Sequence, residues 1–411
     1  MHTRLWFLVL FVLFLAGCTS YFASPPASQA LPTEASPPTA EASPTPTEVS
    51  YPTREAYPPP QGWTPEPTAT SEPTPTPTTL PVPILQVQPL AAEWGKGERI
   101  AFLKDGDLWL VRPDGSAQAQ VTTSGNATAL YGWSYDCTRL LLGVGERPVP
   151  PETDVPGGRD LWVVWVNGHK AEPLVQGLEV LEARWSPVDE QVAYGTRDGN
   201  IHLVNGDGSE HRTLLDSHTG FFGAWSPDAR QIAFLEMDSH TWGQSLALVD
   251  ISSGIKRVLT NSGSKGWGDG YPIWSPEGEK ILFQSTREDP HGRVRWWVMD
   301  LRGDALHLLD SIELQKMPTS AQRPSLSPVS DQVLFYLFNG DGPTIWVMDF
   351  DGSHPRKLAE GGNPTWSPDG RRIAYTDPQG ALRVIHLDGT GALQIVEADQ
   401  NPLWYEPYWC R

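Results

Sequence analysis

The sequence predicts an all-β fold, a seven-bladed β-propeller with four-stranded antiparallel blades, preceded by a disordered Pro/Thr-rich tether. Three observations lead to this prediction. A Trp-Ser-Pro phrase recurs, with successive copies 38 to 52 residues apart. Runs rich in β-branched and aromatic residues follow each copy, separated by Asp-Gly turns and without a helical period. The segment before the repeats consists mainly of Pro, Thr, Ser, Ala and Glu.

Residues 1–17 have the pattern of a secretory signal peptide. A basic start is followed by an apolar run over 5–15, which is shorter than the roughly 20 residues that a membrane-spanning helix needs. The stretch Leu-Ala-Gly-Cys at 15–18 resembles the lipobox of bacterial lipoproteins. This resemblance implies cleavage before Cys18, acylation of its thiol and a lipid anchor at the extracytoplasmic face of a bacterial membrane. The alternative is an ordinary signal peptide in which Cys18 occurs by chance.

The segment 18–89 is expected to be a disordered linker that begins with the lipidated Cys18. Its stretches PTPTEVSYPTREAYPPP and SEPTPTPTTLPVP are typical. Proline fixes φ and removes a backbone donor, so neither helix nor sheet propagates there. Because large apolar residues are few, no core can offset the entropy of ordering the chain. We interpret this segment as an extended, solvated tether.

The segment 90–411 carries the repeats and is expected to form the propeller. Each repeat supplies three strand-like runs, such as 231–235 and 246–250, and the residues just before each Trp supply the innermost strand of the next blade. Four strands in a unit of this length match one propeller blade. Copies of the phrase begin at Trp185, Trp225, Trp274, Leu326 and Trp366, and degraded copies at Trp133 and Trp94.

The phrase Trp-Ser-Pro-Asp-Gly followed by Ile-Ala-Tyr, complete at 366–375, resembles the repeat of TolB-like propellers. Such repeats also occur in propellers attached to prolyl oligopeptidases and tricorn-type proteases. The resemblance covers about 94–404 and implies the architecture, not an activity. TolB has six blades after an α/β domain, whereas the tether takes that place here, so the resemblance does not transfer the family's partner to this chain.

The two ends of the repeat region are expected to form one blade together. The first set of outer strands, roughly 98–122, follows only a poor candidate for an innermost strand at 90–94. The last innermost strand, 401–404, has no outer strands after it. Joining the two completes blade 1 and removes an exposed sheet edge. We therefore predict that Trp404 occupies the repeat position of blade 1.

Two of the three cysteines remain if Cys18 is acylated. Cys137 and Cys410 both follow innermost strands of adjacent blades, at the same side of the ring. In a compartment that permits disulfides, a Cys137–Cys410 bridge would fasten the closing strand. Two free thiols are the alternative.

The long insertions between strands are expected to share one side of the propeller. In a propeller, the loops between the second and third strands of a blade lie on the same side as the connections between blades. All five long insertions belong to these two kinds of loop, and four of them belong to blades 4–6. Loops on a rigid scaffold commonly carry binding residues, and aromatic and arginine side chains are typical interface anchors. These loops could instead merely pack on one another. The candidate binding-face residues are Trp242, Trp267, Tyr271, Arg287, His291, Arg293 and Arg295.

Catalytic motifs are absent from the sequence. It contains no G-x-S-x-G elbow, no H-E-x-x-H and no phosphate-binding loop, and its acidic Asp-Gly turns lack the later ligand of a calcium loop. We therefore expect no catalytic residue, metal or cofactor. The formal net charge of −19 argues against nucleic acid as a partner.

The sequence predicts a monomeric, lipid-anchored propeller that serves as a scaffold for an unknown protein or glycan. The alternative is a hydrolase or lyase that acts on an envelope or extracellular polymer at the mouth of the central channel. Clustered carboxylates at that mouth would favour the enzyme, and an aromatic patch would favour binding. A purely structural spacer is a third interpretation.

Overall fold

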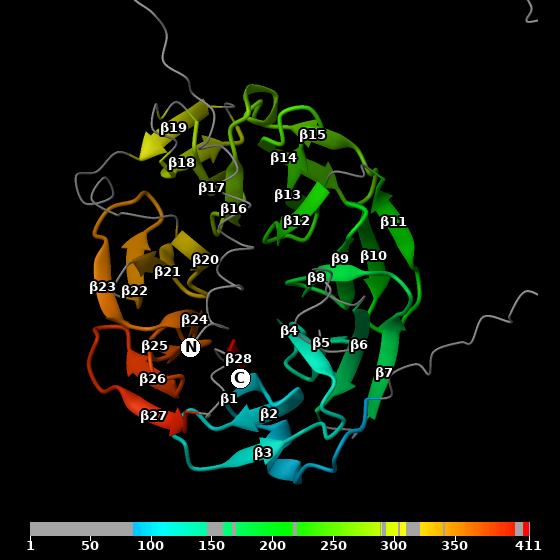
Figure 1. Ribbon diagram of the computed structural model, residues 1–411, viewed down its shortest axis with the longest axis vertical. Helices are drawn as coiled ribbons and strands as arrows, with labels where there is room; N and C mark the ends of the chain where they lie inside the picture. Colours follow the sequence, from blue (N-terminus) through cyan, green and yellow to red (C-terminus); the bar gives the residue numbers. More distant parts are fainter. Residues whose placement is uncertain are drawn as a thin grey trace, which may run out of the picture. The chain divides into compact units, whose positions relative to one another are not determined.

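Seven four-stranded antiparallel sheets follow one another around a ring, which confirms the predicted seven-bladed all-β propeller (Figure 1). The computed structural model describes residues 85–145, 159–166, 170–216, 220–287, 289, 293–302, 305–309, 321–339, 342–398 and 406–410. The predicted signal peptide, Cys18 and the tether as far as residue 84 lie outside this range. The helices among the described residues are the two 3₁₀ turns η1 (Ala92–Gly95) and η2 (Gly263–Lys265), and neither could cross a membrane.

Each blade begins with a strand at the ring axis and ends with a strand at the rim, and blade 1 takes its axial strand from the C-terminal part of the chain. Blade 1 contains β28 (Tyr408–Cys410), β1 (Arg99–Lys104), β2 (Asp107–Val111) and β3 (Gln118–Gln120). Blades 2 and 3 contain β4 (Ala127–Trp133), β5 (Arg139–Val144), β6 (Asp160–Trp165) and β7 (Lys170–Val175), then β8 (Val180–Trp185), β9 (Gln191–Thr196), β10 (Ile201–Asn205) and β11 (Arg212–Leu215). Blades 4 and 5 contain β12 (Gly220–Trp225), β13 (Gln231–Met237), β14 (Gln244–Asp250) and β15 (Lys256–Val258), then β16 (Asp269–Trp274), β17 (Lys280–Ser285), β18 (Arg295–Asp300) and β19 (Ala305–Leu309). Blades 6 and 7 contain β20 (Ala321–Leu326), β21 (Gln332–Asn339), β22 (Gly342–Asp349) and β23 (Arg356–Glu360), then β24 (Gly362–Trp366), β25 (Arg372–Thr376), β26 (Leu382–His386) and β27 (Leu393–Val396).

The hydrophobic core lies between adjacent blades. One cluster, for example, packs Ala193 and Ile201 of blade 3 against Ile232 and Phe234 of blade 4. Because each blade is covered on both faces, its middle strands are largely buried, and all six residues of β5 are buried. This explains why the strands are continuous apolar runs rather than alternating ones.

The recurring phrase forms the turn between the first and second strands of blades 2 to 7, where the N–H of its Ser donates to the carbonyl of the residue five positions later. In blade 7, the Ser367 hydroxyl is fully buried, donates to Asp369 at 2.6 Å and accepts from the backbone N–H of Arg372 at 2.9 Å. The preceding Trp366 donates its indole N–H to the Ser325 carbonyl on the axial strand of blade 6 at 3.2 Å. The phrase therefore closes a tight turn and ties neighbouring axial strands together.

Blade 1 combines strands from both ends of the repeat region, as predicted, but its axial strand is not the predicted one. The predicted segment 401–404 is wrong, because β28 pairs with β1 and places Trp409, not Trp404, opposite Ile100. Trp366 lies opposite Ile373 in the same way in blade 7. The indole of Trp133 donates to the Tyr408 carbonyl at 2.9 Å, the same bond by which other blades are tied. Residues 401–405 lie outside the described residues.

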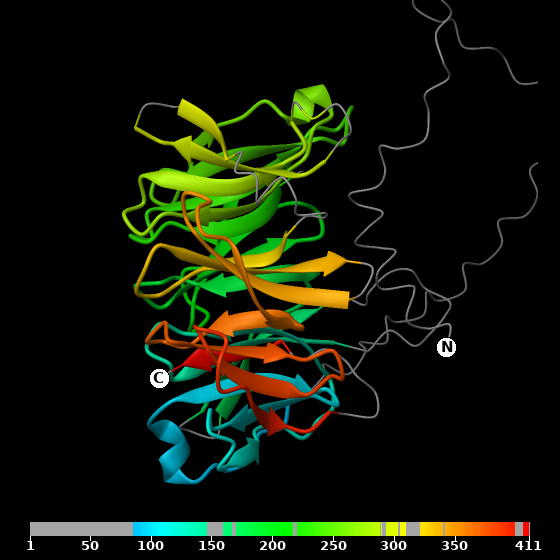
Figure 2. The ribbon, with the colours of Figure 1, turned by 90° about the vertical axis from the view of Figure 1, so that its left-hand side faces the viewer.

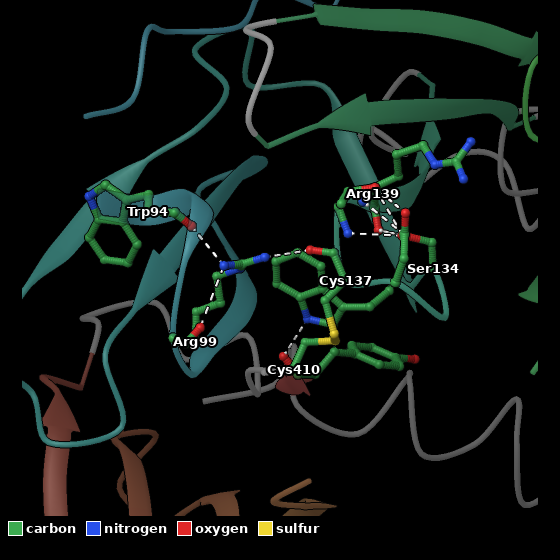
Figure 3. Close-up of a disulfide and its surroundings, with 11 residues drawn as sticks. Trp94, Arg99, Ser134, Cys137, Arg139 and Cys410 are labelled. Atoms are coloured by element: carbon green, nitrogen blue, oxygen red, sulfur yellow. Dashed lines mark hydrogen bonds between the residues drawn. A yellow bond between two sulfur atoms is a disulfide. The ribbon is translucent and has the colours of Figure 1, made fainter. Parts of the chain in front are cut away.

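A disulfide joins Cys137 of blade 2 to Cys410 of β28, with 5.8 Å between the Cα atoms (Figure 3). This is the pair expected from the sequence. The guanidinium of Arg99 lies beside it and donates to the Cys137 and Trp94 carbonyls at 2.5 and 2.9 Å. The closing strand is therefore held covalently to Cys137, and the buried Arg99 guanidinium ties its partner strand β1 to the same residue of blade 2.

The two sides of the propeller carry different elements. Figure 2 shows η1 and the end of β28 on one side and η2 on the other. The turns of the recurring phrase belong to the first side, because each axial strand ends there. The long loops that connect blades belong to the second side.

Candidate functional site

Two loops of blades 4 and 5 combine into one surface on the long-loop side, which we call the loop platform (238–243 and 260–268). The N–H of Gln244 donates to the Trp267 carbonyl at 2.8 Å, and Gln244 forms a parallel bridge with Gly268. The Thr241 hydroxyl donates to the Gly263 carbonyl in η2. The structure thus brings Trp242 and Trp267, two of the predicted contact residues, onto neighbouring segments.

The tip of the β13–β14 hairpin is organised by Asp238. Its carboxylate accepts from the backbone N–H groups of His240 and Thr241, both at 2.9 Å, and its carbonyl accepts from the N–H of Trp242 at 2.9 Å. This tight turn places Trp242 at a φ of +60°, a conformation that a bulky residue rarely adopts. The Trp242 side chain is nevertheless 73% exposed. Backbone strain of about 1–3 kcal/mol is therefore retained for a residue that packs little against the fold.

Gly243 allows the close approach of the two loops. A Cβ atom at this position would lie 2.6 Å from the Gly263 carbonyl oxygen and 2.7 Å from that of Trp267. Only a glycine fits between these backbones. The position of Trp242 is therefore fixed by contacts on the residue that follows it.

A buried ion pair supports the platform from below. Arg287 donates to both carboxylate oxygens of Asp269 at 3.0 Å and to the Ser262 hydroxyl at 2.7 Å. Its side chain is only 6% exposed, and that of Asp269 is fully buried. The Arg287 guanidinium also lies over the rings of Phe283 and Trp297, at 5.3 and 5.2 Å from their centroids. Arg287, predicted as a contact residue, instead fixes the loops that carry the contacts, because its charge requires a buried partner.

The other predicted contact residues lie elsewhere. Arg293 and Arg295 both pair with Asp289, at 3.1 and 3.3 Å, and Arg293 is 59% exposed. Tyr271 lies on the axial strand β16, and its hydroxyl donates to Gln322 of blade 6 rather than to the loop platform. Trp267 is half-buried, with the Lys265 ammonium 4.6 Å from its ring centroid. His291 lies outside the described residues.

A second set of polar side chains comes from the axial strands, and the sequence analysis did not single it out as a group. Its members come from axial strands or their immediate neighbours, and electrostatic interactions link blades 1, 2, 3, 5 and 6 around the axis. We call it the axial cluster, and it consists of Tyr131, Glu182, Tyr271, Arg323, Tyr336, Glu406 and Tyr408.

The axial strands carry β-bulges that turn these side chains out of the ladder. Register shifts occur at the same level in β16, β20 and β24. At these shifts Tyr271, Arg323 and Asn363 have φ values of +52°, +47° and +50°. A proline follows each of them in the sequence. In the sequence, a polar or aromatic residue therefore recurs directly before Pro-x-Trp or Pro-x-Leu. This pattern was a signal for residues of the axial cluster that the sequence analysis missed.

Hydrogen bonds and ion pairs connect the cluster between blades. The Tyr271 hydroxyl donates to Gln322 Oε1 of blade 6 at 2.9 Å. Arg323 pairs with Glu406, which leads into β28, so this contact spans blade 7. Both partners remain substantially exposed, at 45% and 39% of their side chains.

Burial dominates the protonation behaviour of the cluster. It raises the pKa of Glu182 to about 7, against a lowering influence of the nearby Arg184 guanidinium. Burial also raises the pKa of Tyr131 and of Tyr271, so both hydroxyls stay protonated at neutral pH. Within the described residues, no group of three or more His, Cys, Asp and Glu side chains is placed to hold a metal ion.

Comparisons with known proteins agree with the propeller fold. No protein-family model matches the chain. Uncharacterized protein Atu1656 of Agrobacterium fabrum is 26% identical over 206 residues, which are 46% of this chain and 64% of that protein. The Tol-Pal system protein TolB of Anaeromyxobacter dehalogenans is 30% identical over 146 residues, 34% of this chain and 30% of TolB. The chain thus spans less than two thirds of either relative.

Among solved structures, an oligogalacturonate lyase in complex with manganese superposes with a TM-score of 0.55 and 16% identity. The superposition covers 74% of this chain and 86% of the lyase. At this identity the likeness concerns the fold alone. The chain therefore has the β-propeller fold, and it is similar in sequence to TolB over part of its length.

Proposed function

We propose that this protein is an extracytoplasmic, lipid-anchored scaffold that binds a protein partner through the loop platform. One observation carries the proposal: Trp242 is held in a strained conformation on a cross-tied loop and yet exposes 73% of its surface. Aromatic side chains held rigidly at a surface are typical interface anchors, because little conformational entropy is lost when they bind.

The buried Asp269–Arg287 pair supports the same interpretation. A buried ion pair contributes little net stability compared with apolar residues of similar size, and its value lies in fixing one arrangement of the loops. Here it connects the loop before η2, the start of β16 and the end of β17. A preorganised surface of this kind needs no rearrangement on binding.

The proposed location rests on the lipobox-like stretch at 15–18 and on the disulfide. Disulfides persist in extracytoplasmic compartments and are rare in the cytosol. Acylation of Cys18 would hold the protein at the membrane. We expect Cys18→Ala to shift the protein from the membrane fraction to the soluble fraction and to abolish incorporation of labelled fatty acid. A variant that stays on the membrane unlabelled would contradict the anchor.

The partner can be sought by pull-down of the full chain from detergent-solubilised envelopes, with an affinity tag inserted in the tether. The test variant is Trp242→Ala combined with Trp267→Ala. The matched control is Tyr135→Ala, which removes a 51% exposed aromatic side chain from the opposite side of the ring. We expect the wild type and the control to retain the same partner, and the double variant to recover at least tenfold less, a loss of about 1.4 kcal/mol or more. Equal recovery with all three proteins would overturn the proposal.

A further inference from the structure

The described end of the tether shows from which side the chain enters the ring. Leu85 is 4% exposed. The Thr123 N–H donates to the Gln86 carbonyl at 3.1 Å, and the Gln88 N–H donates to the Val121 carbonyl at 2.8 Å. Because this pairing is antiparallel, the chain enters from the side on which β3 connects to β4. Connections between blades lie on the long-loop side, which also carries η2 of the loop platform (Figure 2).

We propose that the Tyr-Pro-Pro-Pro segment of the tether (57–60) docks on the loop platform of its own chain and competes there with the protein partner. The inference rests on the proposed function, because it describes a regulation of the same surface. It assigns an occupant to the platform in the absence of a partner.

The loop platform has the chemistry that a proline-rich segment binds. Such segments dock on exposed aromatic side chains, because a preformed polyproline II helix loses little conformational entropy on binding. Trp242 exposes 73% of its surface, and Trp267 on the neighbouring segment is half-buried. Contacts of Gly243 with the backbone of Gly263 and Trp267 hold the two segments together. The segment 57–60 contains the longest uninterrupted run of prolines in the chain.

The tether is long enough for this contact. Pro60 precedes Leu85 by 25 residues. A proline-rich chain spans about 3.1 Å per residue, so this stretch can reach about 75 Å. A compact domain of the length of 85–411 has a radius of gyration of about 20 Å, which corresponds to a diameter of about 50 Å. The segment 57–60 can therefore reach blade 4 along the long-loop side.

Attachment to the same chain makes even a weak contact effective. A segment on such a linker acts at an effective concentration on the order of 1 mM. A contact with a dissociation constant of about 0.1 mM would then cover the platform in roughly nine tenths of the molecules. A partner can bind only the uncovered fraction, so its apparent affinity falls about tenfold.

Photo-cross-linking of the full chain tests the contact without the partner. A benzophenone amino acid replaces His240, whose side chain is 91% exposed and lies in the same turn as Trp242. We expect illumination to join position 240 to the tether peptide that contains 57–60, within one chain and with a yield that tenfold dilution does not change. Trp242→Ala in the same background should lower this yield at least fivefold, because it removes the aromatic surface.

Controls distinguish docking from random encounters. Substitution of all three prolines of 57–60 by serine should lower the yield as Trp242→Ala does. Pro37→Ser combined with Pro38→Ser, at another proline pair of the tether, should leave it unchanged. The same photo-reactive residue in place of Tyr135, on the opposite side of the ring, should not capture the tether. Absence of the product from position 240, an equal yield from position 135, or a product that joins two chains would overturn the inference.

The pull-down from solubilised envelopes then tests the competition. The variant without the three prolines should recover at least threefold more partner than the wild type, because its platform is uncovered. Equal recovery would overturn the competition. The cross-link requires no partner, so the two proposals fail separately. A cross-link without any recovered partner would refute only the protein-binding function, and a recovered partner without the cross-link would refute only the docking of 57–60.

Discussion

Loss of the Cys137–Cys410 disulfide is expected to lower the free energy of unfolding by about 2–4 kcal/mol. The two cysteines are 273 residues apart, and for a loop of that length the chain-entropy model gives about 5–6 kcal/mol. Measured effects are usually smaller, and β28 keeps other contacts in the reduced state. Trp409 is 8% exposed, and the Arg372 guanidinium lies 5.0 Å from its ring centroid. The reduced ring should therefore remain closed at 25 °C but unfold at lower denaturant concentration.

The assay is urea unfolding followed by tryptophan fluorescence, for the oxidised protein, the protein with a phosphine reductant, and Cys137→Ser combined with Cys410→Ser. The double variant should match the reduced wild type and should not respond to the reductant, which controls for other effects of reduction. Peptide mapping of the unreduced protein should recover the two cysteines in one cross-linked species. Coincident unfolding curves for all three samples would refute the argument that this bond constrains the unfolded chain.

Three further changes test the loops and the axis. Asp269→Asn should cost about 3–5 kcal/mol in urea unfolding, because it leaves the Arg287 guanidinium buried without its counter-charge; a loss below 1 kcal/mol would contradict this role. Gly243→Ala should destabilise the protein by about 1–3 kcal/mol, since its Cβ has no space, whereas Gly268→Ala, with no atom within 4 Å of the added Cβ, serves as the matched control. Glu182→Gln should stabilise the protein at pH 8 and have no effect at pH 4. Because the folded-state pKa of Glu182 is raised to about 7 from 4.5, the ionisation penalty is absent below pH 4.5 and complete above pH 7. Because solvent screens this half-buried group, we expect Glu182→Gln to raise the free energy of unfolding at pH 8 by about 1–2 kcal/mol rather than by the full value of the pKa shift. Equal effects of the substitution at pH 4 and pH 8 would show that ionisation is not the cause.

The architecture was predictable because the recurring phrase marks the tight turn between the first and second strands of successive blades. Its Ser closes the turn in blades 2 to 7, and its Trp donates to the neighbouring axial strand at Trp133, Trp225, Trp274 and Trp366. The closing strand was harder to locate. Both Pro402-Leu-Trp404 and Pro407-Tyr-Trp409 have the spacing of an axial strand, and nothing local distinguishes them. Only pairing with β1, some 300 residues away in the chain, selects Trp409.

The candidate site was predictable only in part. Trp242 and Trp267 lie in long loops, and loop length is visible in the sequence. The burial of Arg287 was not visible, because its partner Asp269 lies at the start of β16, 18 residues away. The axial cluster depends on contacts between blades, such as that of Arg323 with Glu406, which are 83 residues apart. The pattern within a single repeat cannot predict pairs of this kind.

The origin of β28 has a consequence for the order in which the protein is made. Chains emerge from the ribosome N-terminus first, and domains generally fold as units during or after synthesis. Blade 1 has its three outer strands early, but its axial strand consists of residues 408–410. Blades 2 to 7 can each assemble as they appear, whereas the ring stays open, with one edge of β1 unpaired, until the last of these residues has been delivered. For an exported protein, closure and formation of the cross-link must then follow translocation of the chain as far as residue 410.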